Sequence, residues 1–181
     1  MLLIQSFIIH AQQNLNPNSL GLDGDVYAFV SDGTYTYVGG AFYFATINSA
    51  GKIGNGGLVD KITGIPLPDP YKILNVSNFG FINGFINAAI PDGSGGWFIG
   101  GKFNTVKGVT RNHIAHILAD NTVDATWNPD IFGVQVYSLL LVGTHLYVGG
   151  NFSALNNGGI LRDDIARLDA ATGAVDPHLG P

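Results

Sequence analysis

One stretch of the sequence occurs three times, and this internal repetition constrains the fold more than any other feature. Each copy has an apolar run, a short turn, and a second apolar run that ends in Gly-Gly, one variable residue and Phe. The recurring glycines and phenylalanines are Gly39, Gly40 and Phe42, then Gly100, Gly101 and Phe103, and then Gly149, Gly150 and Phe152. The period is 61 residues from Gly40 to Gly101 and 49 residues from Gly101 to Gly150. Periods near these lengths are typical of β-propeller blades.

Each copy contains signals for about four β-strands. The first two runs flank a hairpin turn of the Asp-Gly or Gly-Thr kind. Two glycines within a strand indicate a bulge or the close approach of another backbone, and we expect the Phe that follows to fill the space between blades. A further strand-like run follows, and each copy closes on an aspartate, namely Asp69, Asp124 or Asp176. We therefore predict an all-β chain of about three four-stranded blades, belonging to a larger propeller ring of about seven blades.

The composition supports this fold class and excludes several functions. Of the 181 residues, 46% are hydrophobic and only 12% are charged, which is typical of a compact apolar domain. All 13 acidic residues are Asp, and the scarcity of strong helix formers argues against a helical bundle. A formal charge of −5 without a basic cluster excludes nucleic acid as a partner. The absence of Cys excludes disulfides and thiol nucleophiles.

The second and third copies share a longer pattern. Residues 111–120 have the sequence Arg-Asn-His-Ile-Ala-His-Ile-Leu-Ala-Asp, and residues 162–169 have the sequence Arg-Asp-Asp-Ile-Ala-Arg-Leu-Asp. Val123-Asp124 and Val175-Asp176 follow them. Together with the Tyr-Val-Gly-Gly-x-Phe strands, this order resembles the delta-60 repeat family of β-propellers, and it is similar to the propellers of fungal cortical polarity markers. The first copy departs from the pattern, because residues 56–61 are Gly-Gly-Leu-Val-Asp-Lys.

The resemblance covers about residues 22–181 and implies a secreted or surface-exposed bacterial propeller without an assigned catalytic motif. It transfers no functional residue to this chain, since the shared positions are those that strands and turns already require. Any function must therefore be argued from the residues of this chain.

The repeats suggest a division of the chain. Residues 1–11 resemble the apolar part of a secretory signal, with Ala11 before the cleavage point, and residues 12–21 form a linker. Basic residues do not precede the apolar run, so we expect either that a few residues of the signal are lost before Met1 or that the run is a buried first strand. We expect blades at about 22–70, 82–130 and 132–181, and no transmembrane segment. Because a propeller ring needs about 4 to 8 blades, we expect either further blades in the same polypeptide or association of copies.

A pattern typical of catalysis is missing, so we predict no catalytic, cofactor-binding or metal-binding residue and no cofactor. We expect His113 and His116 to be ordinary strand residues, because their spacing directs the two side chains to opposite faces of a strand and keeps them from converging on one metal. The other histidines, His10, His145 and His178, are isolated in the sequence. The acidic pairs Asp23–Asp25 and Asp163–Asp164 lack the oxygen-rich loop that calcium needs.

The connection between the first two blades is the feature that most suggests a function. It spans residues 69–86, which is longer than the next connection, and it carries Tyr71, Asn75, Asn78 and Phe79. Insertions in repeat folds often form a binding face, although a neutral insertion is an equal alternative. We expect a non-catalytic, secreted or cell-surface module that binds a protein or glycan. The alternatives are part of a glycan-acting propeller enzyme whose site needs further blades, and a structural spacer in a large adhesin.

Overall fold

The computed structural model describes residues 21–22, 24–42, 45–46, 54–60, 62, 72–74 and 84–178. The signal-like segment 1–11 and the linker up to residue 20 lie outside these ranges. So do the four residues of the suggested binding loop, which are Tyr71, Asn75, Asn78 and Phe79.

The described residues are all-β, as the sequence predicts, and form three main antiparallel sheets that we call blades 1, 2 and 3. Blade 1 has the strand order β2-β3-β5-β6, with bounds Asp25–Ser31, Tyr35–Ala41, Gly54–Asp60 and Lys72–Leu74. Blade 2 has the order β7-β8-β11, with bounds Phe85–Pro91, Trp97–Lys102 and Ile114–Ile117. Blade 3 has the order β12-β13-β15, with bounds Phe132–Val142, His145–Leu155 and Ile165–Asp169.

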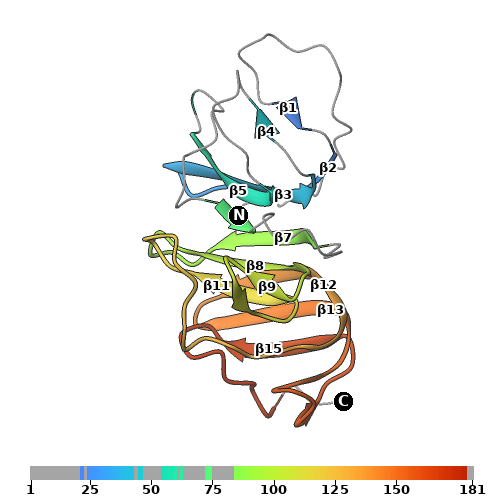
Figure 1. Ribbon diagram of the computed structural model, residues 1–181. Helices are drawn as coiled ribbons and strands as arrows, with labels where there is room; N and C mark the ends of the chain where they lie inside the picture. Colours follow the sequence, from blue (N-terminus) through green and yellow to red (C-terminus); the bar gives the residue numbers. More distant parts are fainter. Residues whose placement is uncertain are drawn as a thin grey trace.

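The remaining strands are short. β14 (Ile160–Leu161) pairs with the end of β13, and two further pairs are β1 (Gly21–Leu22) with β4 (Ala45–Thr46) and β9 (Thr105–Val106) with β10 (Val109–Thr110). Figure 1 shows the three blades following one another in chain order, from β2, β3 and β5 through β7 and β8 to β12, β13 and β15.

The sequence predicts about four strands in each blade, and the outermost strand differs between the blades. In blade 1 the fourth strand, β6, lies within residues 69–86, which the sequence suggested as an extended loop. In blades 2 and 3 the fourth strand is reduced to one bridge, Ile117 to Val123 or Leu168 to Val175. A single bridge suffices there because the following aspartate, Asp124 or Asp176, donates its backbone N–H to the third strand.

The bulge that the Gly-Gly pairs indicated lies in the strand facing them. Pairing between the first and second strands shifts between Val26 and Ala28, between Ile86 and Ala88, and between Val136 and Ser138. A side chain at the second glycine of each pair would collide with a carbonyl oxygen of the bulged strand, namely that of Asp25, Phe85 or Gln135. The glycine is therefore the residue that lets the two strands pair closely at the bulge.

The first glycine of each pair positions the next blade. A Cβ built on Gly39 would lie 2.8 Å from Cγ2 of Ile86, and one built on Gly100 would lie 2.5 Å from Cγ1 of Val136. A β-branched side chain from the first strand of the next blade thus fills the space that the missing side chain leaves. We call this space the glycine notch.

Apolar side chains fill the two spaces between blades. Between blades 1 and 2 the buried cluster includes Tyr37, Ile86, Trp97 and Phe103, and between blades 2 and 3 it includes Phe98, Trp127, Val136, Leu146 and Phe152. Phe42, the remaining repeat phenylalanine, is also buried and packs with Val38 and Val59. Burial of this apolar area supplies most of the stability of the stack.

Filling a glycine notch from within should destabilise the stack. We expect Gly100→Ala to lower the free energy of unfolding by about 1 to 3 kcal/mol, because the new methyl group and Val136 cannot share the same space. The matched control is Gly149→Ala, where the only close neighbour among the described residues is the Ser138 hydroxyl, which can rotate away. Urea denaturation of both variants measures the difference, and equal losses would contradict this packing.

Candidate functional site

The first strands of the three blades are neighbours, because β7 contacts β2 and β12 contacts β7. The bulge in each of these strands adds one residue that has no partner in the register, and this residue is Tyr27, Asn87 or Tyr137. These three residues, together with Gln135, form what we call the first-strand row. The row crosses all three blades and is the candidate functional site.

Contacts between and within blades hold the members of the row in place. The ring of Tyr27 meets the ring of Phe85 edge-on, with centroids 5.9 Å apart. Asn87 donates through Nδ2 to the carbonyl of Val136 at 2.7 Å and lies 3.4 Å from Oε1 of Gln135. Gln135 in turn donates through Nε2 to the hydroxyl of Tyr137 at 2.9 Å.

The row offers aromatic faces beside polar groups. Tyr27 is 39% exposed and Tyr137 is 53% exposed, whereas Asn87 and Gln135 are half-buried. Burial, followed by the neighbouring Asp25 carboxylate and its hydrogen bond, raises the pKa of Tyr27, so its hydroxyl stays neutral at physiological pH. Amide groups donate and accept hydrogen bonds, and tyrosine presents an apolar ring with a polar tip. Such a surface suits a ligand with both apolar faces and hydroxyl groups.

Sequence reasoning treated the three row positions as ordinary strand residues. A signal was present, because Tyr27, Asn87 and Tyr137 occupy the same position in three aligned copies, and all three side chains are polar or carry a polar tip. The signal was missed because the Gly-Gly pairs suggested a bulge in their own strand. In a first strand without a bulge, side chains simply alternate between the two faces, so nothing distinguishes Tyr27, Asn87 or Tyr137 from its neighbours.

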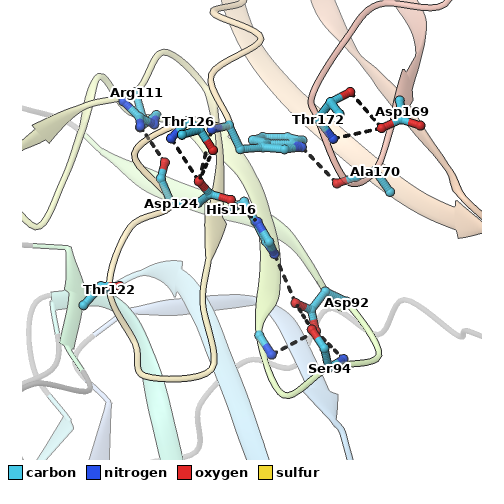
Figure 2. A network of polar contacts seen from close by, with 12 residues as sticks. Asp92, Ser94, Arg111, His116, Thr122, Asp124, Thr126, Asp169, Ala170 and Thr172 are labelled. Carbon is cyan, nitrogen blue, oxygen red and sulfur yellow. Dashed lines mark hydrogen bonds and ion pairs between the residues drawn. The ribbon is translucent and has the colours of Figure 1, made fainter.

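A second polar cluster lies on blade 2, where His116 is held between two carboxylates (Figure 2). Its Nδ1 lies 3.0 Å from Asp124 Oδ2, and its Nε2 lies 3.1 Å from Asp92 Oδ2. The imidazole is buried, stacks on Phe98 at a centroid distance of 4.4 Å, and meets Trp127 edge-on. These residues are far apart in the sequence, so their grouping depends on the fold.

The geometry of this cluster is that of a structural clamp. Both ring nitrogens of His116 face carboxylates, so neither is free to accept a proton from a substrate or to ligate a metal. Asp92 also accepts hydrogen bonds from Ser94 and the Gly96 backbone, and Asp124 accepts them from Thr126 and the Trp127 backbone. Among residues 84–178 and the shorter described stretches, no group of three or more His, Asp or Glu side chains could hold a metal ion.

The position of His116 is occupied by a different residue in each of the other blades. In blade 3, Arg167 replaces the histidine and reaches Asp176 at 2.7 Å through Nη2. In blade 1 the position is occupied by Leu58, which is buried in the core. This variation supports a structural role for the position.

The arginine that begins the shared pattern also has a structural role. Arg111 donates to the carbonyls of Thr110 and Asp124 at 2.7 and 2.6 Å. Arg162 makes the matching bonds to Leu161 and Asp176 in blade 3, at 2.7 and 3.3 Å. Both arginines tie the start of the third strand to the aspartate that closes the repeat.

The remaining sequence candidates do not converge. His113 precedes β11 in a left-handed conformation with φ of 66°, so the expectation that it is an ordinary strand residue is wrong, while His116 is within the strand. His145 is 3.9 Å from Asp176, and the backbone of His178 donates to Asp176. Asp163 and Asp164 form the turn before β15, whereas His10 and Asp23 lie outside the described residues.

The comparisons with known proteins agree with this architecture. Residues 91–126, which comprise most of blade 2, match the family model described as a β-propeller domain of unknown function (DUF5122). No curated protein and no solved structure shows a significant match to the chain. Within the part of the chain that the structure describes, no helix is long and apolar enough to cross a membrane. The three sheets are therefore built as propeller blades, and blade 2 is similar to this family.

The clamp around His116 should make stability sensitive to acid. Burial opposes ionisation of Asp124, but hydrogen bonds from Thr126, His116 and Trp127 outweigh it and lower the pKa of Asp124 to about 2. In the unfolded chain an aspartate carboxyl has a pKa of about 3.9. The contribution of the Asp124 carboxylate to the free energy of unfolding is therefore complete above about pH 4, and it is lost as the pH falls through about 2. Since Asp124 is partly exposed, we expect this contribution to be about 1 to 2 kcal/mol.

Urea denaturation between about pH 5 and pH 2 measures this contribution. The loss of stability on acidification should be smaller in Asp124→Asn than in the wild type, because the amide does not titrate. Thr126→Val removes one hydroxyl donor while keeping the side-chain shape, so its acid dependence should be intermediate. Identical pH dependence in the wild type and Asp124→Asn would contradict the assignment.

Proposed function

We propose that the chain is a non-catalytic β-propeller module of the delta-60 repeat type that binds a glycan at the cell surface or outside a bacterial cell. The family match over blade 2 supports the propeller part of this proposal. The Arg-x-x-Ile-Ala pattern of the second and third copies supports the finer assignment. The apolar segment that ends at Ala11 supports secretion.

The observation that carries the binding proposal is the first-strand row. Its two exposed tyrosines flank amide side chains that hydrogen bonds already hold in place. The apolar C–H face of a sugar ring packs on an aromatic ring, and its hydroxyls bind amides, because each side matches the other in polarity. Side chains on paired strands are held more rigidly than those on loops, which reduces the entropy lost on binding.

Residues Tyr71, Asn75, Asn78 and Phe79 provide a second proposed contact region. They belong to the connection that leads from blade 1 to β7, and β7 carries Asn87 of the row. A protein ligand is the alternative occupant of the same surface.

Replacement of one row tyrosine tests this function. Glycan-array screening of the full chain, followed by titration of the best ligand, should give binding that Tyr137→Ala weakens by about 5- to 30-fold, since an aromatic contact contributes about 1 to 2 kcal/mol. The control is Leu161→Ala, which truncates an exposed apolar side chain of the same blade outside the row. Its affinity should match the wild type.

Two negative results would distinguish a wrong binding site from a wrong class of ligand. Glycan binding that Tyr137→Ala and Tyr27→Ala both leave unchanged would exclude the row as the binding site. An absence of glycan binding, together with capture of a purified surface protein that depends on Tyr137, would replace the glycan by a protein ligand at the same site.

A further inference from the structure

The variable residue of each Gly-Gly-x-Phe segment lies beside the first-strand row. It is paired with the first-strand residue two positions before the bulged one, which gives the pairs Asp25 with Ala41, Phe85 with Lys102, and Gln135 with Asn151. Directly paired residues have Cβ atoms about 4.5 to 5.5 Å apart on the same face of a sheet. Each variable residue therefore adds a side chain to the surface of the row.

Three of these residues come together where blades 1 and 2 meet, and we call Tyr27, Phe85 and Lys102 the aromatic junction. The ring of Tyr27 lies edge-on to the ring of Phe85, and Lys102 shares the face of Phe85 through their pairing. Tyr27 and Lys102 are exposed, whereas Phe85 is half-buried. The junction therefore combines two aromatic rings with one ammonium group.

The equivalent residues where blades 2 and 3 meet are all amides, and we call Asn87, Gln135 and Asn151 the amide junction. Asn87 Nδ2 lies 3.4 Å from Gln135 Oε1, and the exposed Asn151 is paired with Gln135. Amides supply hydrogen-bond donors and acceptors but no charge. The two junctions thus offer different chemistry at equivalent places in the repeat.

The ammonium group of Lys102 has no counter-ion within the part of the chain that the structure describes. Lys102 takes no part in the ion pairs or side-chain hydrogen bonds of these residues. The other lysine and arginine side chains that the structure describes each bind an acceptor of their own blade, namely Lys107, Arg111, Arg162 and Arg167. Lys102 is therefore a cation that the fold itself does not use.

The neighbouring His113 does not add to this charge. Burial lowers the pKa of His113, and the charge of Lys102 lowers it further, although the Gly133 backbone and the Asp130 carboxylate act in the opposite direction. His113 is therefore neutral at physiological pH. Asp130 Oδ1 accepts a hydrogen bond from Asn112 at 2.6 Å. The positive charge of Lys102 thus remains available to a ligand.

The charges around the aromatic junction favour one placement of an anionic group. An aromatic ring packs against the C–H face of a sugar, and an ammonium group pairs with a carboxylate or a sulfate. The Asp25 carboxylate lies 3.4 Å from the Tyr27 hydroxyl and repels a second anion there. An anionic substituent is therefore favoured at Lys102 and disfavoured at the Tyr27 hydroxyl.

We propose that the aromatic junction binds an anionic sugar, whose ring packs on Tyr27 and Phe85 and whose negative group lies beside the Lys102 ammonium. The adjoining sugar binds through its hydroxyls to the amide junction. This inference rests on the glycan-binding function proposed above and narrows the ligand to acidic glycans.

Isothermal titration calorimetry of the full chain tests the proposal with matched ligands. The ligands are oligosaccharides of galacturonate, glucuronate and mannuronate, each with its carboxyl-reduced, uncharged counterpart, and sulfated galactan with its desulfated form. The acidic member of at least one pair should bind about 3- to 10-fold more tightly. This preference should shrink as salt is added, because salt screens a charge pair at the surface. Comparison of the uronate and sulfate pairs identifies the anionic group.

Variants locate the origin of the preference. Lys102→Gln should abolish it, and Lys102→Arg should retain it because the charge remains. Lys107→Gln is the matched control, since it removes the same charge from blade 2 at a residue bound to the Asn121 carbonyl outside the row. Tyr27→Ala should weaken the binding of acidic and neutral ligands alike. Circular dichroism of each variant checks that the blades remain folded.

The negative outcomes separate this inference from the function on which it rests. Glycan binding that depends on the row tyrosines but shows no preference for anionic sugars would overturn the inference and leave the proposed function in place. A preference that Lys102→Gln leaves intact, or that Lys107→Gln reduces equally, would overturn the role of Lys102. Binding of neither acidic nor neutral glycans would overturn both proposals.

Discussion

The missing side chain at the first glycine of each pair is the constraint on which the arrangement of the blades depends. Without a Cβ at Gly39 or Gly100, the next first strand can approach until Ile86 or Val136 lies directly against the backbone of the preceding blade. That approach brings aromatic residues such as Trp97 and Phe98 into the spaces between blades, where they are buried. Close packing of this kind is sensitive to the addition of a single methyl group.

The third strand of each blade accepts a wider range of side chains than the glycine pair does. The position of His116 is filled by Leu58 in blade 1 and by Arg167 in blade 3, and in each case the local surroundings match the side chain. The N–H groups of an imidazole or a guanidinium need hydrogen-bond acceptors beside them, whereas a buried leucine needs none. The aspartate that closes the second and third repeats supplies these acceptors. The repeat therefore keeps its backbone while apolar packing in blade 1 is replaced by hydrogen bonds to a carboxylate in blades 2 and 3.

The sequence predicts the all-β fold because glycine pairs and turn residues act locally. It fails where a long-range contact decides the structure. The link between His116 and Asp92 depends on how the hairpin turn of blade 2 folds back, and the left-handed conformation of His113 depends on the turn before β11. β6 lies in a stretch without clear alternation, and its pairing with β5 makes it a strand. For the same reason the first-strand row emerges only when neighbouring blades are stacked.

The row and the glycine notch lie on the same strands, and this connects folding with binding. At each bulge the flanking residues pack in the notch and the sheet, so the backbone of Tyr27, Asn87 or Tyr137 is fixed by neighbours that cannot change freely. The side chain is not part of the notch packing, and it is Tyr in blades 1 and 3 and Asn in blade 2. A position with a fixed backbone and a side chain outside the core can change its chemistry at little cost to stability. Sheets that stack through glycine notches thus carry, on a rigid backbone, a row of side chains that the core packing does not determine, which is the property that a binding surface requires.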